Sequence, residues 1–307
     1  MKNQQGFTLI ELAIVLVIVT ILIGGLAIPL SAQIEARRIA ETNKTLEEAK
    51  EAIIGYAMSN TCTNKCQAPP SSSFACANSG LATECNSAIC DIVCATLPPN
   101  TSSSTVTTTL KRHYLPCPSH DGTGVAAPRN NAGECISCSD ADNNGYDDTT
   151  GKPCNLLPWA TLGAADKDAL GNRLHYSVTS AYANSKQGFY SGGPTADLNV
   201  CAKSTTPCEA VAAGVPAVIL SHGNNGWGAL NINKNVLAAP VGTDEKTNIE
   251  TPSIPVGSTT HVTHVTRPPY KPVSNTAAER AKEFDDQLLW ISSYELNSRI
   301  CPNGGCP

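Results

Sequence analysis

Two short segments of this sequence carry side chains whose types and spacing suit ion-binding or redox chemistry. In the first, oxygen donors recur at alternate positions, and the set is Asp140, Asp142, Asn144, the carbonyl of Tyr146, and Asp148. This is the spacing of a calcium loop with Gly145 at the sharp turn, although Gly151 stands where such loops carry a bidentate Glu. Because Asn-Gly is also a strong turn signal, the segment is either a calcium site or a solvated turn.

The second segment, Cys135-x-x-Cys138, has the spacing of a redox motif or of half a zinc site. No second Cys pair or His pair with ligand spacing accompanies it, so we expect disulfides instead. His261 and His264 would lie on opposite faces of a strand, and Ser221-His222 lacks the G-x-S-x-G context of a catalytic serine. The sequence therefore predicts no enzyme and, calcium apart, no cofactor.

Composition limits the class of protein that must position these segments. The chain has 307 residues, 41% of them hydrophobic and 15% charged, which predicts a folded protein. A formal net charge of -5 gives no basic field, so no nucleic-acid partner is indicated. All 14 Cys lie between Cys62 and Cys306, which indicates a domain in a compartment where disulfides persist.

Ahead of every cysteine lies one long apolar segment, from Phe7 to Leu30, whose single ionisable side chain is Glu11. As a helix it would span about 36 Å, enough to cross a bilayer core. We therefore predict a transmembrane helix with the cysteine-rich bulk outside the cytoplasm. A carboxylate in such a segment is costly, so Glu11 needs a partner that is a cation or a hydrogen-bond donor.

The start of this segment is unlike a secretory signal peptide, because only MKNQQG precedes it. The stretch from Gly6 to Leu12, GFTLIEL, resembles the N-terminal processing signature of type IV pilins and of the pseudopilins of type II secretion systems. The resemblance implies cleavage between Gly6 and Phe7 by a prepilin peptidase, N-methylation of Phe7, and pairing of Glu11 with the N-terminal amine of a neighbouring subunit. A plain signal anchor is the alternative, but it gains nothing from Glu11 or from Gly6-Phe7.

Beyond Leu30 the helical pattern becomes amphipathic. Residues recurring at spacings of three and four predict one buried stripe made of Ile39, Thr42, Leu46, Ala49, Ile53 and Tyr56. A continuous helix from Phe7 to about Met58 would be about 78 Å long. In the resembled family the bare halves of such helices bundle in a filament core while the globular parts face outward.

Five segments follow from these patterns: a leader at 1–6, a transmembrane or filament-core helix at 7–30, an amphipathic helix half at 31–58, a Cys/Ser/Thr-rich insertion at 59–110 and a β-rich globular domain at 111–307. We expect an α+β, pilin-like fold with the long helix packed on an antiparallel β-sheet and with disulfide-rich loops. Apolar runs predict strands at 173–178 and 215–223, loops around 242–277, and a strand leading to a short helix at 284–299.

Taken with the resemblance, these features predict a structural subunit of a type IV pilus or type II secretion pseudopilus. It would sit in the bacterial inner membrane as a single-pass protein, contacting lipid, with its C-terminal domain in the periplasm. An assembly platform would then add it to a pilus or pseudopilus made of other such subunits. The large globular part favours a minor or tip subunit. The alternatives are a filament-borne adhesin or binding module, and a membrane-anchored calcium-binding protein that never polymerises.

Overall fold

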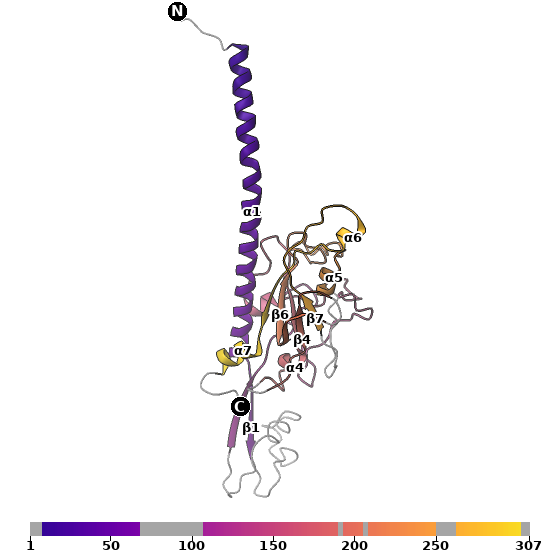
Figure 1. The fold of residues 1–307 in the computed structure, drawn as a ribbon. Coiled ribbons are helices and arrows are strands. Elements are labelled where there is room, and N and C mark those ends of the chain that lie inside the picture. Colours follow the sequence, from indigo (N-terminus) through magenta and orange to yellow (C-terminus); the bar gives the residue numbers. More distant parts are fainter. Residues whose placement is uncertain (1–7, 68–106, 190–192, 205–207, 250–261, 302–307) are drawn as a thin grey trace, which may run out of the picture.

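The computed structural model describes residues 8–67, 107–189, 193–204, 208–249 and 262–301. Figure 1 shows one long helix standing beside a β-rich domain, with the N-terminal half of the helix extending beyond the domain. The predicted α+β class, with a long N-terminal helix, is confirmed.

Helix α1 (Leu9–Ser59) is continuous over 51 residues and runs through Pro29 without a break. It ends where the amide of Asn60, which has an extended backbone, donates to the Tyr56 carbonyl at 2.9 Å. The predicted single helix that carries both the apolar and the amphipathic segment is therefore confirmed within the described residues.

The amphipathic half of α1 buries most of the predicted stripe. Thr42, Leu46, Ala49 and Ile53 are buried, and Tyr56 is half-buried. Ile39 is 41% exposed, so the prediction was wrong for this residue. The physical reason is that close packing of the helix on the domain begins at Thr42, about one turn after Ile39, so the apolar periodicity begins before the packed interface does.

The layer next to α1 is an antiparallel sheet of three strands in the order β3 (His175–Val178), β6 (Ala217–Ser221) and β8 (Gln287–Ile291). Its central strand, β6, is buried along its whole length. The strand and helix expected at 284–299 are present as β8 and α7 (Ser293–Ile300), and the strands expected at 173–178 and 215–223 correspond to β3 and β6.

Alternate residues of this sheet face two different cores. Ala217 and Ile219 of β6 belong to the large cluster that includes the buried stripe of α1, whereas Val218 between them packs with Leu198, Val200 and Val215. The second cluster belongs to another sheet, so the domain has three layers, with α1 outermost. The strand period of two places one face of β6 on the helix and the other on the second sheet.

That second sheet has the order β5 (Ala210–Val215), β4 (Leu198–Cys201) and β7 (Val262–Val265). Strands β4 and β5 are antiparallel, but β4 and β7 are parallel, which corrects the expectation of an antiparallel sheet. The reason lies in the connection, because the long segment between β4 and β7 supplies the crossover that a parallel pair needs.

The segment expected as loops around 242–277 contains β7 and the helix α5 (Thr243–Ile249), so this prediction was also wrong. The sequence TDEKTNI gave no apolar periodicity because α5 buries polar side chains, Glu245 and Asn248, together with Ile249. Three further helices of one turn complete the described elements: α3 (Trp159–Leu162), α4 (Ser180–Ala183) and α6 (Ala277–Arg280).

The ends of the predicted insertion pair with each other. Strands β1 (Thr61–Gln67) and β2 (Thr107–His113) are antiparallel, with Cys62 opposite Arg112. Figure 1 shows this two-stranded sheet beyond the C-terminal end of α1, at the opposite end of the molecule from the N-terminus. Strand β2 crosses the expected boundary at residue 110, and residues 68–106 lie outside the described part of the chain.

Candidate functional site

The N-terminal end of α1 holds the described part of the predicted processing and assembly site. Gly6 and Phe7 lie outside the described residues, whereas Thr8 is the N-cap and Glu11 occupies the third helical position. The amide and hydroxyl of Thr8 donate to Glu11 Oε2 at 2.9 and 2.8 Å, and Thr8 Oγ1 accepts from the Glu11 amide at 3.4 Å. This reciprocal arrangement is a capping box, which satisfies two amides at the helix start.

Thr8 therefore supplies the donor that the Glu11 carboxylate needs, from within its own helix. Sequence reasoning named only the amine of a neighbouring subunit, although the T-x-x-E spacing of a capping box was present in the sequence. Both donors reach Oε2, and Oε1 has no hydrogen bond to any described residue. The carboxylate can thus accept a further donor while it caps its own helix.

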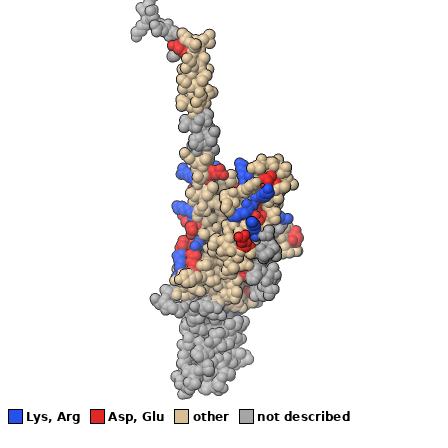
Figure 2. Space-filling view, viewed as in Figure 1, with Lys and Arg blue, Asp and Glu red and all other residues tan. Residues whose placement is uncertain are grey.

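Following this cap, α1 presents an uninterrupted apolar surface. Every residue from Thr8 to Leu22 is exposed, including Leu9 at 90%. Figure 2 shows acidic side chains only near the tip of this stretch, where Glu11 lies, and no Lys or Arg on the face in view. Contiguous apolar surface of this extent marks a site of contact with another protein or with lipid.

Within the described part of the chain, no helix is both long enough and apolar enough to cross a membrane.

The predicted calcium loop is a closed turn held by its own side chains. Asp140 accepts from the amides of Asn144 and Gly145, both at 3.0 Å, and Asp148 Oδ2 accepts from the Ala141 amide at 2.9 Å. Burial raises the pKa of the Asp140 carboxyl, and neighbouring Asp142 acts in the same direction. Asp142 Oδ2 accepts from the side-chain amide of Asn144 at 2.9 Å.

The predicted ligand atom of Tyr146 is its backbone carbonyl, and its side-chain hydroxyl is directed away from the loop and donates to the Gly228 carbonyl at 3.1 Å. The backbone amide of Tyr146 donates a hydrogen bond to Asn144 Oδ1 at 2.8 Å. The described geometry fits a turn, and calcium binding by this loop stays a prediction.

Cys135 and Cys138 both form disulfides, but with other partners. Cys117 pairs with Cys135, and Cys138 pairs with Cys154, so the second bridge encloses the loop from Asp140 to Asp148. A third bridge joins Cys201 at the end of β4 to Cys208. The expectation of disulfides in place of a redox or zinc motif is confirmed for this pair.

The other candidate residues are separated or buried. Ser221 Oγ donates to Asp168 Oδ2 at 2.7 Å, and no described hydrogen bond joins it to His222. His264 is buried in β7, and burial lowers its pKa to about 4. His261 lies outside the described residues.

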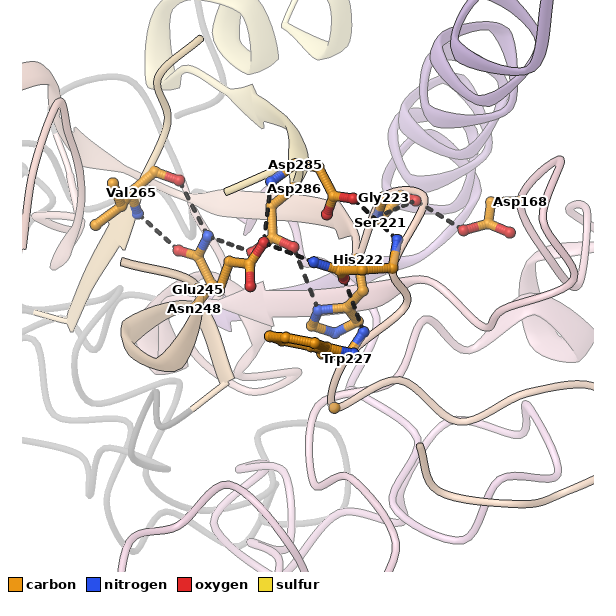
Figure 3. Close-up of polar contacts among 12 residues, drawn as sticks. Asp168, Ser221, His222, Gly223, Trp227, Glu245, Asn248, Val265, Asp285 and Asp286 are labelled. Atoms are coloured by element: carbon orange, nitrogen blue, oxygen red, sulfur yellow. Dashed lines mark hydrogen bonds and ion pairs between the residues drawn. The ribbon is translucent and has the colours of Figure 1, made fainter. Parts of the chain in front are cut away.

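One cluster was absent from the sequence predictions. Glu245 of α5 and the adjacent Asp285 and Asp286, just before β8, bring carboxylate oxygens within 4.8 Å of one another (Figure 3). Burial, with the charge of Asp286, raises the pKa of Glu245 to about 8, and burial raises that of Asp285 to about 6. The only signal in the sequence was the acidic pair at the start of an otherwise apolar strand.

Comparison with known proteins bears on the N-terminal site. Residues 1–27 match the family model described as a prokaryotic N-terminal methylation motif, which supports the pilin and pseudopilin signature. No curated protein and no solved structure matches the chain.

Proposed function

We propose that the chain is a structural subunit of a type IV pilus or of a type II secretion pseudopilus. The observation that carries this proposal is the methylation motif at residues 1–27, which leads into a helix whose residues from Thr8 to Leu22 are all exposed. The same helix is packed against a globular domain from Thr42 onward. One part can therefore enter an apolar environment while the other part stays folded outside it.

In this proposal a prepilin peptidase cuts between Gly6 and Phe7, and the new amine on Phe7 is methylated. Residues 7–30 hold the chain in the inner membrane as a single span, with the domain in the periplasm. An inner-membrane assembly platform then moves it into a bundle of pilin or pseudopilin helices. There the free Oε1 of Glu11 accepts the amine of a neighbouring subunit while Oε2 stays bonded to Thr8.

We place the subunit at the tip of a filament or among its minor components. The sheet of β1 and β2 lies past the C-terminal end of α1 (Figure 1), and in a bundle of parallel helices this is the direction in which the next subunit would stack. At a filament end that space is open. A globular part of this size is also harder to repeat along a thin filament than a small one.

Cleavage is tested by the intact mass and N-terminal sequence of the protein recovered from its own cells. We expect an N-terminus at Phe7 with one added methyl group, and a Gly6→Leu variant that keeps residues 1–6 because the cleavage site is blocked. Retention of residues 1–6 in the unaltered protein would contradict the proposal.

Assembly is tested by replacing Glu11 with Ala. Glu11→Ala is expected to be cleaved and to stay in the membrane, but to be lost from sheared filaments, because no carboxylate is left to accept the neighbour's amine. Glu47→Ala is the matched control, since Glu47 is an exposed carboxylate on the packed half of the same helix. Equal recovery of the two variants in filaments would show that assembly does not need Glu11. Absence of the unaltered protein from filaments would favour an anchored protein that does not polymerise.

A further inference from the structure

The carboxylates of Glu245, Asp285 and Asp286 come from two segments that are distant in the sequence. Glu245 lies in the first turn of α5, and the two aspartates lie between the bridge at Phe284 and the start of β8. A third segment, the turn after β6, completes the surroundings with His222 and Asn225 (Figure 3). The cluster thus stands where three separate parts of the domain meet.

Some of the carboxylate oxygens are well satisfied. Glu245 Oε1 accepts from the Asp285 amide at 2.9 Å and from the side-chain amide of Asn225 at 3.1 Å. Asp285 Oδ2 accepts from the Asn225 amide at 2.9 Å, and Asp286 Oδ2 accepts from the side chain of Asn248 at 2.8 Å. These bonds fix the positions of all three carboxylates.

Two of the remaining oxygens have no hydrogen-bond partner among the described residues. Glu245 is 1% exposed, yet its Oε2 has no hydrogen-bond partner within the described residues, and the same is true of Asp285 Oδ1. None of the ion pairs in the described part of the chain joins a Lys or Arg to any of the three carboxylates. Burial without a cation or a donor disfavours the charged form of a carboxylate, so a bound cation would stabilise these carboxylates in that form.

His222 gives an independent indication that something is missing. Its side chain is fully buried, and neither ring nitrogen has a hydrogen-bond partner within the described residues. Its Nδ1 faces Asp286 Oδ1 across 3.7 Å, too far for a hydrogen bond. In metal sites, hydrogen bonds from neighbouring side chains commonly orient a carboxylate that binds the metal, and His222 is placed to supply such a contact to Asp286.

We propose that Glu245, Asp285 and Asp286 bind one hard divalent cation, which ties α5 to the start of β8. The donor set is made of carboxylate oxygens without a cysteine, and oxygen donors suit Ca²⁺, Mg²⁺ or Mn²⁺ rather than a thiophilic metal. Glu245 Oε2 and Asp285 Oδ1 are the two oxygens free to bind it. This site is distinct from the loop at Asp140–Asp148 and does not depend on filament assembly.

A cavity lies next to the cluster. This cavity of about 410 Å³, partly open to solvent, is lined by residues that include Asn224 and Asn225. Asn225 bonds both Glu245 and Asp285, so the polar wall of this cavity adjoins the cluster.

The test uses the full chain in detergent, stripped of metal with EDTA and exchanged into buffer without chelator. Thermal unfolding is then followed in EDTA and in millimolar CaCl₂, MgCl₂ or MnCl₂, and bound metal is counted by mass spectrometry. At a hundredfold excess over Kd we expect at least one of these salts to raise Tm by roughly 5–10 °C. Equal Tm values of the unaltered protein in EDTA and in all three salts would overturn the proposal.

The Glu245→Gln variant distinguishes a metal ligand from a merely structural carboxylate. It keeps the shape and the bonds to Oε1 but removes one charge, so its Tm in EDTA should equal or exceed that of the unaltered protein. Its response to the cation should largely disappear, with at least about tenfold weaker binding and one fewer bound ion per chain. A Glu245→Gln protein that keeps the whole cation-dependent rise would overturn the site.

Two further variants keep the test decisive. Asp285→Asn is used with the same readouts if Glu245→Gln does not fold, because Asp285 is only half-buried. Asp140→Asn combined with Asp142→Asn is the control for the other acidic segment, and it should leave the response of the Glu245 site in place. Loss of the whole response in that control, with none lost in Glu245→Gln or Asp285→Asn, would assign the cation to the loop and reject this proposal.

Discussion

The two halves of α1 share one unbroken helix but have opposite surroundings. From Thr8 to Leu22 every side chain is exposed, although the segment is almost wholly apolar. From Thr42 to Ala57 the helix buries Thr42, Leu46, Ala49, Ile53, Ile54 and Ala57. The same helical backbone therefore carries a surface that no described residue covers and a surface that belongs to the main core.

The arrangement of apolar residues around each half of α1 indicates how much of the helix is surrounded by other groups. In the second half the apolar residues form a stripe, because only one side of the helix meets the sheet of β3, β6 and β8. In the first half they occur all round, which is the pattern of a helix surrounded by other apolar groups. No described residue of the domain covers residues 8–22, and in the proposed function lipid or other subunits supply their surroundings.

The largest expected effect comes from shortening one isoleucine in each half. Ile53→Ala opens a cavity in the main core, where Ile53 is fully buried, and should lower the free energy of unfolding of the domain by about 2–5 kcal/mol. Ile18→Ala removes the same atoms from an exposed position and should leave that free energy within about 0.5 kcal/mol. Urea unfolding of the detergent-solubilised chain, followed by tryptophan fluorescence, measures both.

If the first half of α1 enters a filament core, Ile18→Ala should affect assembly more than Ile53→Ala does. Ile18→Ala should then reduce the recovery of filaments, while the domain of this variant melts as in the unaltered protein. Equal destabilisation of the domain by both variants would show that the two halves of α1 are not independent.

Acid should lower the stability of the packed domain, because among the described residues the buried histidines all lie there and none lies in the exposed half of α1. Burial lowers the pKa of His264 to about 4, so the unfolded chain binds more protons than the folded chain between about pH 6.5 and pH 4. The stability held above pH 6.5 is therefore lost as the pH falls, by about 3 kcal/mol at most for this one group. Burial and the nearby His222 and His264 lower the pKa of His175 in the same direction.

His264→Leu should reduce this acid sensitivity, since neither ring nitrogen of His264 has a hydrogen bond to lose within the described residues. The measurement is the difference in unfolding free energy between pH 7 and pH 4.5, for the variant and for the unaltered protein. An unchanged difference would mean that His264 is not buried in its neutral form.

Much of this contrast was predictable from local pattern. The buried stripe at Leu46, Ala49 and Ile53 follows from the helical period, and β6 follows from a β-branched run between turn residues. Ile39 was misjudged because periodicity shows which face is apolar but not how far along the helix the domain reaches. The parallel pairing of β7 with β4 depends on how a long connection is routed, which no local pattern contains.

The candidate sites divide in the same way. The processing signature and the bond between Thr8 and Glu11 are contacts between residues close in sequence, so they can be found from spacing alone. The cluster of Glu245 with Asp285 and Asp286 forms only when α5 folds back on the start of β8. The only calcium candidate visible in the sequence, the loop at 140–148 that is alternatively a solvated turn, is a local set of ligands, because spacing along the chain shows only local sets.

The smallest expected effect concerns the more exposed of two ion pairs that join α7 to the packed half of α1, the other being Lys50 with Glu295. Arg299 Nη1 and Nη2 contact Glu51 Oε1 and Oε2 at 2.5 and 2.7 Å, and the guanidinium lowers the pKa of the Glu51 carboxyl. Both side chains are more than a third exposed, so solvent screening limits the pair to less than about 1 kcal/mol. Because the folded-state pKa of Glu51 is depressed, this contribution is present above the pKa of an unfolded Glu and is lost as the pH falls through the folded value.

Arg299→Gln should therefore lower the urea midpoint slightly at pH 7 in low salt, and less at high salt or in acid. Glu47→Gln, on the same half of α1, should leave the midpoint unchanged, and an equal loss in both variants would show that general helix charge, rather than this pair, holds α7 in place.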